Sequence, residues 1–197
     1  TSATAGTITL TNGTLNTNGQ TMSVAFIVSS NSNVRTLTLG ASSITLTGTS
    51  NSSFATTTNF TFNANTSTIT ISGSGGGIQG GGLTFNNMTF SGASTQNLTG
   101  ANTFANLTKT GTAAKTNIFL LSANQTITGT LTINGNSAIN RVLVASDTIG
   151  TARTLTTTGG TVTVTNADFR DITGTGDAGD WDLSAITGGS GDAGGNS

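Results

Sequence analysis

The stretch RTLTLGASSITLTG (residues 35–48) returns in the same register, without a gap, as RTLTTTGGTVTVTN (residues 153–166). Each copy holds two short segments in which Thr alternates with an apolar residue, and a turn containing Gly separates them. A period of two predicts β-strands with one buried face and one solvent face. A strand–turn–strand unit that repeats along a chain is typical of folds built from stacked, similar layers.

The repeat extends upstream of this stretch. AFIVSS (25–30) is echoed by RVLVAS (141–146), and TLNTNG (14–19) by TINGN (132–136), so a cassette occurs at about 14–48 and again at 132–166. NMTFSG (87–92) and NLTKTG (106–111) form a shorter echo about one coil apart. With roughly 20 to 30 residues per coil, the chain would hold roughly seven to nine coils. At about 4.8 Å per rung, these coils would make a rod of roughly 35 to 45 Å.

We therefore predict an all-β protein with a right-handed parallel β-helix, or β-solenoid. Good helix formers are scarce, β-branched residues dominate, and no Pro interrupts the strands. The Asn-Gly turns also fit hairpins, so an antiparallel β-sandwich remains the alternative. Residues 1–166 are assigned to the solenoid coils, and the Asp/Gly-rich residues 167–197 to a C-terminal coil, loop or cap.

The alternation also predicts which apolar side chains face inward. Stacking would bury them as ladders along the axis, with one member contributed by each strand. The predicted inward residues are Ile27, Leu37, Leu46, Ile69, Phe85, Phe104, Ile118, Ile127, Leu143, Leu155, Val164 and Phe169.

Composition argues against several classes of function. The chain has no His and no Cys, which removes Ser-His-Asp triads, thiol catalysis and His or Cys metal sites. A net charge of −1 argues against a nucleic-acid partner, and no apolar run is long enough to insert into a membrane. The chain begins with Thr1, from which we expect a processed or excised product of secretory history.

Six of the seven Asp residues follow Asn166. Asp177, Asp180 and Asp182 lie on a Gly-rich stretch and are weak candidates for a Ca²⁺ site, although a solvated acidic loop explains them more simply. Asp168 and Asp171 could form the carboxylate pair of a glycosidase, but Arg170 between them suggests a local ion pair instead. We expect no enzyme activity and no cofactor.

Two further features have both a functional and a structural reading. Arg35 and Arg153 hold equivalent places in the two cassettes and would either bind an anionic glycan or cap backbone carbonyls at a corner. The run SGSGGGIQGGG (72–82) lacks the Lys-Ser/Thr of a phosphate loop and is read as an exposed loop or a tight corner.

The phrases GTITLTNGTLNTNGQT (6–21), GASTQNLTGANTFANLTKTG (92–111) and NADFRDITG (166–174) resemble repeats of large bacterial surface adhesins. Those are the passenger regions of autotransporters and filamentous-haemagglutinin-like proteins, and phage fibre proteins contain similar phrases. The resemblance covers nearly the whole chain and implies a parallel β-helix on the surface of a cell or virion. It carries no catalytic residue across.

These observations predict a non-enzymatic, extracellular structural or adhesive solenoid in a surface filament or fibre. Its expected partners are further copies stacked head to tail, neighbouring domains of a larger surface protein, or glycans. One alternative is a phage fibre module that binds a host receptor or glycan. A second is ice binding, which requires Thr-X-Thr on every coil of one flat face, whereas we expect the Thr rows on all faces.

Overall fold

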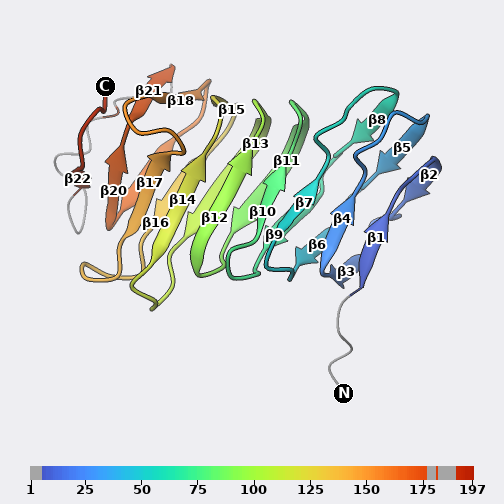
Figure 1. Cartoon of the computed structure of the whole chain (residues 1–197), viewed down its shortest axis with the longest axis horizontal. Helices are drawn as coiled ribbons and strands as arrows, with labels where there is room; N and C mark the ends of the chain where they lie inside the picture. Colours follow the sequence, from blue (N-terminus) through green and yellow to red (C-terminus); the bar gives the residue numbers. More distant parts are fainter. Residues whose placement is uncertain (1–5, 177–180, 182–189) are drawn as a thin grey trace.

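Parallel strands stack in about eight turns in the computed structural model, which describes residues 6–176, 181 and 190–197 (Figure 1). Every pairing between its named strands is parallel, and no helix occurs in the described ranges. The prediction of an all-β parallel solenoid is confirmed, and the antiparallel sandwich is excluded. No helix within those ranges is long and apolar enough to cross a membrane.

Nine strands form the front sheet, with one strand contributed by each turn (Figure 1). In stacking order they are β1 (Thr7–Thr9), β4 (Phe26–Val28), β7 (Asn51–Ser53), β10 (Gly77–Gln79), β12 (Ser94–Thr99), β14 (Asn117–Leu121), β17 (Val142–Ser146), β20 (Ala167–Arg170) and β22 (Ser190–Asp192).

A ten-stranded sheet covers the opposite side and forks at its middle. Its stem is β3 (Thr21–Val24), β6 (Ser43–Leu46), β9 (Thr68–Ile71), β11 (Thr84–Phe90) and β13 (Thr103–Thr110). The N-terminal half of β13 pairs with β15 (Gln125–Ile127), followed by β18 (Arg153–Thr157) and β21 (Ile172–Gly176). The C-terminal half of β13 pairs with β16 (Leu131–Asn134), which is followed by β19 (Val162–Thr165).

A third, three-stranded sheet belongs to the first turns alone and contains β2 (Gly13–Asn16), β5 (Arg35–Thr38) and β8 (Phe60–Asn63). In the following turns β11 and β13 run on around the corner, where separate strands would otherwise lie. We use the term third face for this small sheet together with the branch β15–β18–β21 and the N-terminal halves of β11 and β13.

The core is a thin apolar column whose ladders follow the axis. One ladder runs through Ile44, Ile69, Met88, Leu107 and Leu131, all of them buried. Phe54, Phe60, Phe62, Phe85 and Phe104 form a chain of ring contacts near the third face, with centroids 5.1 to 6.5 Å apart. Such rows bury apolar surface in every turn without the need for one thick core.

Ten of the twelve predicted inward residues are buried, but the prediction was wrong for Ile118 and Leu143. In β14 the buried positions are Asn117, Phe119 and Leu121, so Ile118 lies on the outer side of the front sheet. Ile118 pairs with Leu143 in the next turn, which shares this orientation. In NIFLL every position after the first is apolar, so alternation could not fix the phase.

The glycine-rich run 72–82 contains β10 of the front sheet with a tight turn on either side. A Cβ placed on Gly73 would lie 1.8 Å from the carbonyl oxygen of Gly48, one turn earlier. Only a residue without a side chain lets the two turns approach this closely.

Candidate binding face

Two rows of small polar side chains run along the outer side of the ten-stranded sheet, and we call this surface the hydroxyl face. Each turn contributes two outward residues that flank one inward apolar residue. The first row, here the free row, consists of Ser23, Thr45, Thr70, Thr89, Thr108, Thr132 and Thr163. The second, the tied row, consists of Thr21, Ser43, Thr68, Asn87, Asn106, Thr130 and Thr161.

The free row stays in register over seven consecutive turns. Ser23 pairs with Thr45, Thr45 with Thr70 and Thr70 with Thr89, and the same pattern continues to Thr163. Neighbouring strands lie about 4.8 Å apart, so seven rungs extend over roughly 29 Å. The row is therefore a straight, evenly spaced line of hydroxyl groups.

The side chains of the tied row hold one another in place. The Asn87 amide donates to the Thr68 hydroxyl at 3.3 Å, and the Asn106 amide donates to Asn87 Oδ1 at 2.7 Å. Asn106 Oδ1 in turn accepts the Thr130 backbone N–H at 2.8 Å. The Thr130 and Thr161 hydroxyls also lie 3.4 Å apart, so side-chain contacts link the tied row from Thr68 to Thr161. Thr21 and Ser43, in the first two turns, make no side-chain hydrogen bond to any described residue.

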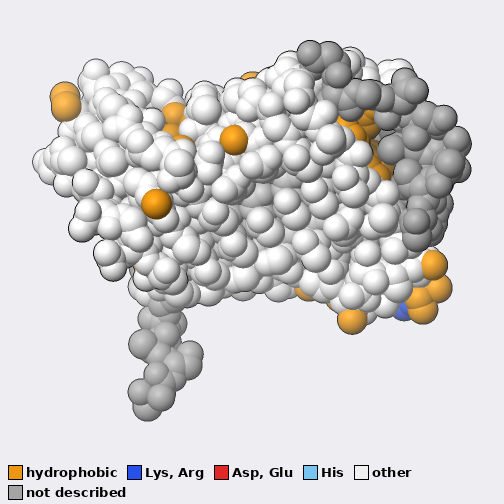
Figure 2. Space-filling model, turned by 180° about the vertical axis from the view of Figure 1, so that it is seen from behind, with side chains coloured by type: hydrophobic (Ala, Val, Ile, Leu, Met, Phe, Trp, Pro, Cys, Tyr) orange, Lys and Arg blue, Asp and Glu red, His pale blue; other side chains and the backbone are white. Residues whose placement is uncertain are grey.

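The hydroxyls of the free row, in contrast, make no hydrogen bond to any of the residues that the structure describes. The interior members are half-buried between their neighbours, which leaves few rotamers open to these mostly β-branched side chains. Water or a ligand must satisfy their donors and acceptors. Neither row contains a charged residue, and the rear view of the molecule is a broad surface nearly free of hydrophobic and charged side chains (Figure 2).

The expectation of Thr rows on every face was wrong for the front sheet. Its outward positions include Ile118, Leu120 and Leu143, and one row reads Thr9, Val28, Ser53, Gln79 and Thr99. The front face therefore offers no continuous line of hydroxyls.

The third face carries one Thr row, and a groove divides it. Thr84, Thr103, Thr126, Thr156 and Thr175 are in register over five turns, and Thr14, Thr36 and Thr61 form a separate piece. Between the two pieces lies a groove of about 320 Å³, because β8 pairs only with β5 and not with β11. Its lining is uncharged and consists of Phe62, Ala64, Asn65, Thr84, Phe85, Asn86, Thr103, Ala105 and Thr128.

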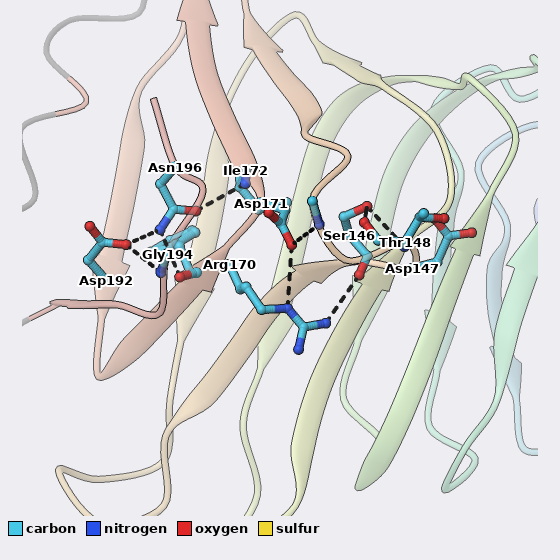
Figure 3. A network of polar contacts seen from close by, with 11 residues as sticks. Ser146, Asp147, Thr148, Arg170, Asp171, Ile172, Asp192, Gly194 and Asn196 are labelled. Carbon is cyan, nitrogen blue, oxygen red and sulfur yellow. Dashed lines mark hydrogen bonds and ion pairs between the residues drawn. The ribbon is translucent and has the colours of Figure 1, made fainter.

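The carboxylates of the proposed glycosidase pair are both engaged by cations. Asp168 accepts from Arg141 at 2.8 Å, a partner one turn away that the sequence did not suggest. Asp171 lies 3.6 Å from Arg170 Nε, as the local ion pair predicted, and also accepts the Gly150 N–H at 3.1 Å (Figure 3). These contacts give both groups a role in holding adjacent turns together.

Two other carboxylates among the described residues also have structural partners. Asp192 accepts from the Gly194 N–H and the Asn196 amide, each at 2.7 Å, in the last turn (Figure 3). Arg153 donates to Asp147 at 2.8 Å, and this bond holds the pKa of Asp147 below its usual range. No group of three metal-ligating side chains occurs in the described part of the chain. Asp177, Asp180 and Asp182, the weak Ca²⁺ candidates, lie outside the described residues.

Arg35 and Arg153 do not share one role. Arg35 is 1 % exposed, donates to the carbonyls of Ser29, Asn33, Thr56 and Thr58, and lies 4.6 Å above the ring of Phe60. It caps a corner from the inside and offers nothing to a glycan. Arg153 instead holds Asp147 at the surface.

One buried charge was missed by sequence reasoning. Lys109 is 0 % exposed, and its Nζ donates to Gln96 Oε1 at 2.6 Å and to the Gly92 carbonyl at 3.1 Å. Burial lowers the pKa of Lys109 from 10.5 to about 8. The echo of residues 87–92 in 106–111 aligns Lys109 with the buried Phe90, and that signal could have placed the amine in the core.

A comparison of the chain with known family models, curated proteins and solved structures gave no match. The function is therefore inferred from the chain's own geometry, and the hydroxyl face is the most regular surface that this geometry provides.

Proposed function

We propose that this chain is a non-enzymatic, extracellular structural and adhesive solenoid that holds its target through the hydroxyl face. It would form part of a filament or fibre on the surface of a cell or virion. The observation that carries the proposal is the free row, seven consecutive rungs of aligned hydroxyls without protein partners.

The physics of adhesion favours such a row. A single hydrogen bond contributes only about 0.5 to 1.5 kcal/mol after exchange with water. Hydroxyls fixed on one rigid sheet, however, can contact a repeating surface simultaneously. Once the first contact has formed, each later contact costs little further translational entropy. A stiff solenoid with a flat polar face suits a target that is itself extended and repetitive.

Other features support a structural role over catalysis. The carboxylates of Asp147, Asp168, Asp171 and Asp192 serve ion pairs or turns, and the groove on the third face has no charged lining residue. General acid–base chemistry on a sugar needs two free carboxyl groups across a cleft. The described residues offer none.

The end of the stack supports a partner along the axis. Within the described residues, strands β1, β2 and β3 each pair on one side only. The inward side chains of this turn, Ile8, Leu15 and Met22, are only half-buried. Unpaired strand edges invite another strand. We therefore propose that a neighbouring domain or a second copy stacks there head to tail, which sedimentation and negative-stain microscopy at rising concentration would detect.

The adhesive role is tested with two matched double variants. Thr89→Tyr with Thr108→Tyr disrupts the middle of the free row, and Thr126→Tyr with Thr156→Tyr places the same bulk on the third face. Each protein is applied to films of cellulose and chitin, to a glycan array and to ice. We expect the wild type to be retained on at least one of these materials, and only the free-row variant to lose retention. Equal retention of both variants, or no retention of the wild type on any material, would overturn the proposal.

A further inference from the structure

We infer that the hydroxyl face binds ice, that is, a crystalline lattice of water. This inference rests on the proposed adhesive function and names the target of the same face. It is carried by two rows of hydroxyl and amide groups on one sheet, repeated without interruption over seven turns.

The spacing of the rows suits water ordered in two dimensions. Along each row, from one strand to the next, the groups repeat at about 4.8 Å. Along a single strand, the outward residues i and i+2 lie about 6.7 Å apart, which is the separation between the two rows. Three of the seven turns carry Thr at both places, as in Thr68 and Thr70. In the other four turns Ser or Asn takes one of the two places, so the face departs from a strict Thr-X-Thr repeat and keeps a polar hydrogen-bonding group at every position. Both distances are close to repeats of the oxygen positions on faces of hexagonal ice. Waters bound to this grid would already stand near lattice positions.

The two rows contribute differently to ice binding. From Thr68 to Thr161 the tied row is linked by its own contacts, such as Asn106 to Asn87 at 2.7 Å, which keep its outward groups aligned. The free row has its hydroxyls unused by the described protein and must bond to water. Bridging water gives nearly the enthalpy of a direct hydrogen bond, and its entropic cost is smallest where the water is already immobile. A growing ice face provides such water.

The chemistry of the face argues for ice over other repeating targets. No acidic or basic residue occurs in either row, so an anionic glycan or a mineral ion would find no opposite charge. A neutral oligosaccharide is bound best in a shaped pocket with a few convergent polar groups. The groove lies instead on the third face, around Phe62 and Thr84. Uniform flat rows match a lattice of identical molecules.

The test is nanolitre osmometry, which measures the gap between the melting and freezing temperatures of a single ice crystal. We expect the wild type to open a gap that grows with protein concentration and to shape the crystal into facets. Thr89→Tyr with Thr108→Tyr should abolish the gap, and Thr126→Tyr with Thr156→Tyr should leave it unchanged. Thr89→Val with Thr108→Val, which keeps the shape and removes the hydroxyls, should reduce it and guards against misfolding of the bulky variant.

The outcomes separate this inference from the proposed function. A wild type without a gap or facets would overturn ice binding, while retention on cellulose or chitin that depends on Thr89 and Thr108 would keep the adhesive proposal. A gap that survives in both the Tyr and the Val variants of the free row would overturn the assignment of ice to this face.

Discussion

Replacing Lys109 by Met should remove most of the alkaline pH dependence of stability. Lys109 lies in an inward ladder between Phe90 and Ile133, and its ammonium has only Gln96 Oε1 and the Gly92 carbonyl as acceptors. None of the ion pairs among the described residues includes it. Folding therefore buries a charge without a counter-ion, which favours the neutral amine.

The sign and the size of the effect follow from the lowered pKa. Between the folded pKa of about 8 and the ordinary 10.5 of an unfolded chain, the unfolded state binds more protons. The free energy of unfolding must then rise with pH through this window, by about 2 kcal/mol between pH 7 and pH 9.5 and by roughly 3 kcal/mol in full. In Lys109→Met this rise should be absent.

The assay is urea unfolding followed by circular dichroism at several pH values from 7 to 9.5. Few other groups titrate in this window, because the chain has no His, Cys or Tyr and its only other lysine, Lys115, is exposed. The α-amino group, which titrates near pH 8, is common to the wild type and the variants and cancels in the comparison. Lys115→Met is the matched control and should keep the full rise. At any single pH, Lys109→Met gains stability from removal of the buried charge and loses stability because Gln96 Oε1 is left without a donor. The diagnostic quantity is therefore the slope of the free energy of unfolding against pH, not its value at one pH. A Lys109→Met protein with the wild-type slope, or a wild type that loses stability from pH 7 to 9.5, would refute the reasoning.

The remaining predictions concern stability and are read from unfolding curves at pH 7. Leu107→Ala should lower the free energy of unfolding by roughly 2 to 5 kcal/mol because the side chain is fully buried. Leu143→Ala, on the outer side of the front sheet, should lower it by less than about 1 kcal/mol. Equal losses would mean that the inward and outward positions of β17 are wrongly assigned. Arg35→Lys should cost roughly 1 to 3 kcal/mol, since three donors cannot replace the guanidinium's contacts to several corner carbonyls, and an unchanged midpoint would contradict that capping role. Gly73→Ala should cost roughly 1 to 3 kcal/mol because its Cβ collides with the backbone of Gly48, and a neutral effect would show that the corner is looser than described.

Sequence patterning predicted the architecture well because each strand of a solenoid carries its own alternation of apolar and polar residues. Thr-Ile-Thr-Ile at 68–71 alternates without exception, and in β9 the two Ile side chains are buried while the two Thr side chains lie on the outer side, as the pattern predicts. Where alternation is lost, as in the apolar run 118–121, the phase could not be derived, and Ile118 was misplaced. The prediction failed because β14 keeps Asn117, Phe119 and Leu121 inside.

The candidate face needed the register between turns, which no single strand reveals. Thr45, Thr70 and Thr132 each stand in a phrase that predicts a strand, but only stacking shows that they share one line. Turn lengths vary, with 19 residues from Ile69 to Met88 and 31 from Leu131 to Val162 along the same face. The ladder absorbs these differences at the corners, so a fixed period would not have found the row.

The most direct test of the hydroxyl face uses the absence of cysteine from the chain. A single Thr108→Cys or Thr126→Cys variant places one thiol on the hydroxyl face or on the third face, and its alkylation rate by a maleimide is measured in solution and in an ice slurry that retains the protein. Contact through the hydroxyl face predicts that adsorption slows labelling at position 108 and leaves position 126 as reactive as in solution. Equal protection at both positions, or protection at 126 alone, would contradict the assignment of the hydroxyl face as the surface that meets the target.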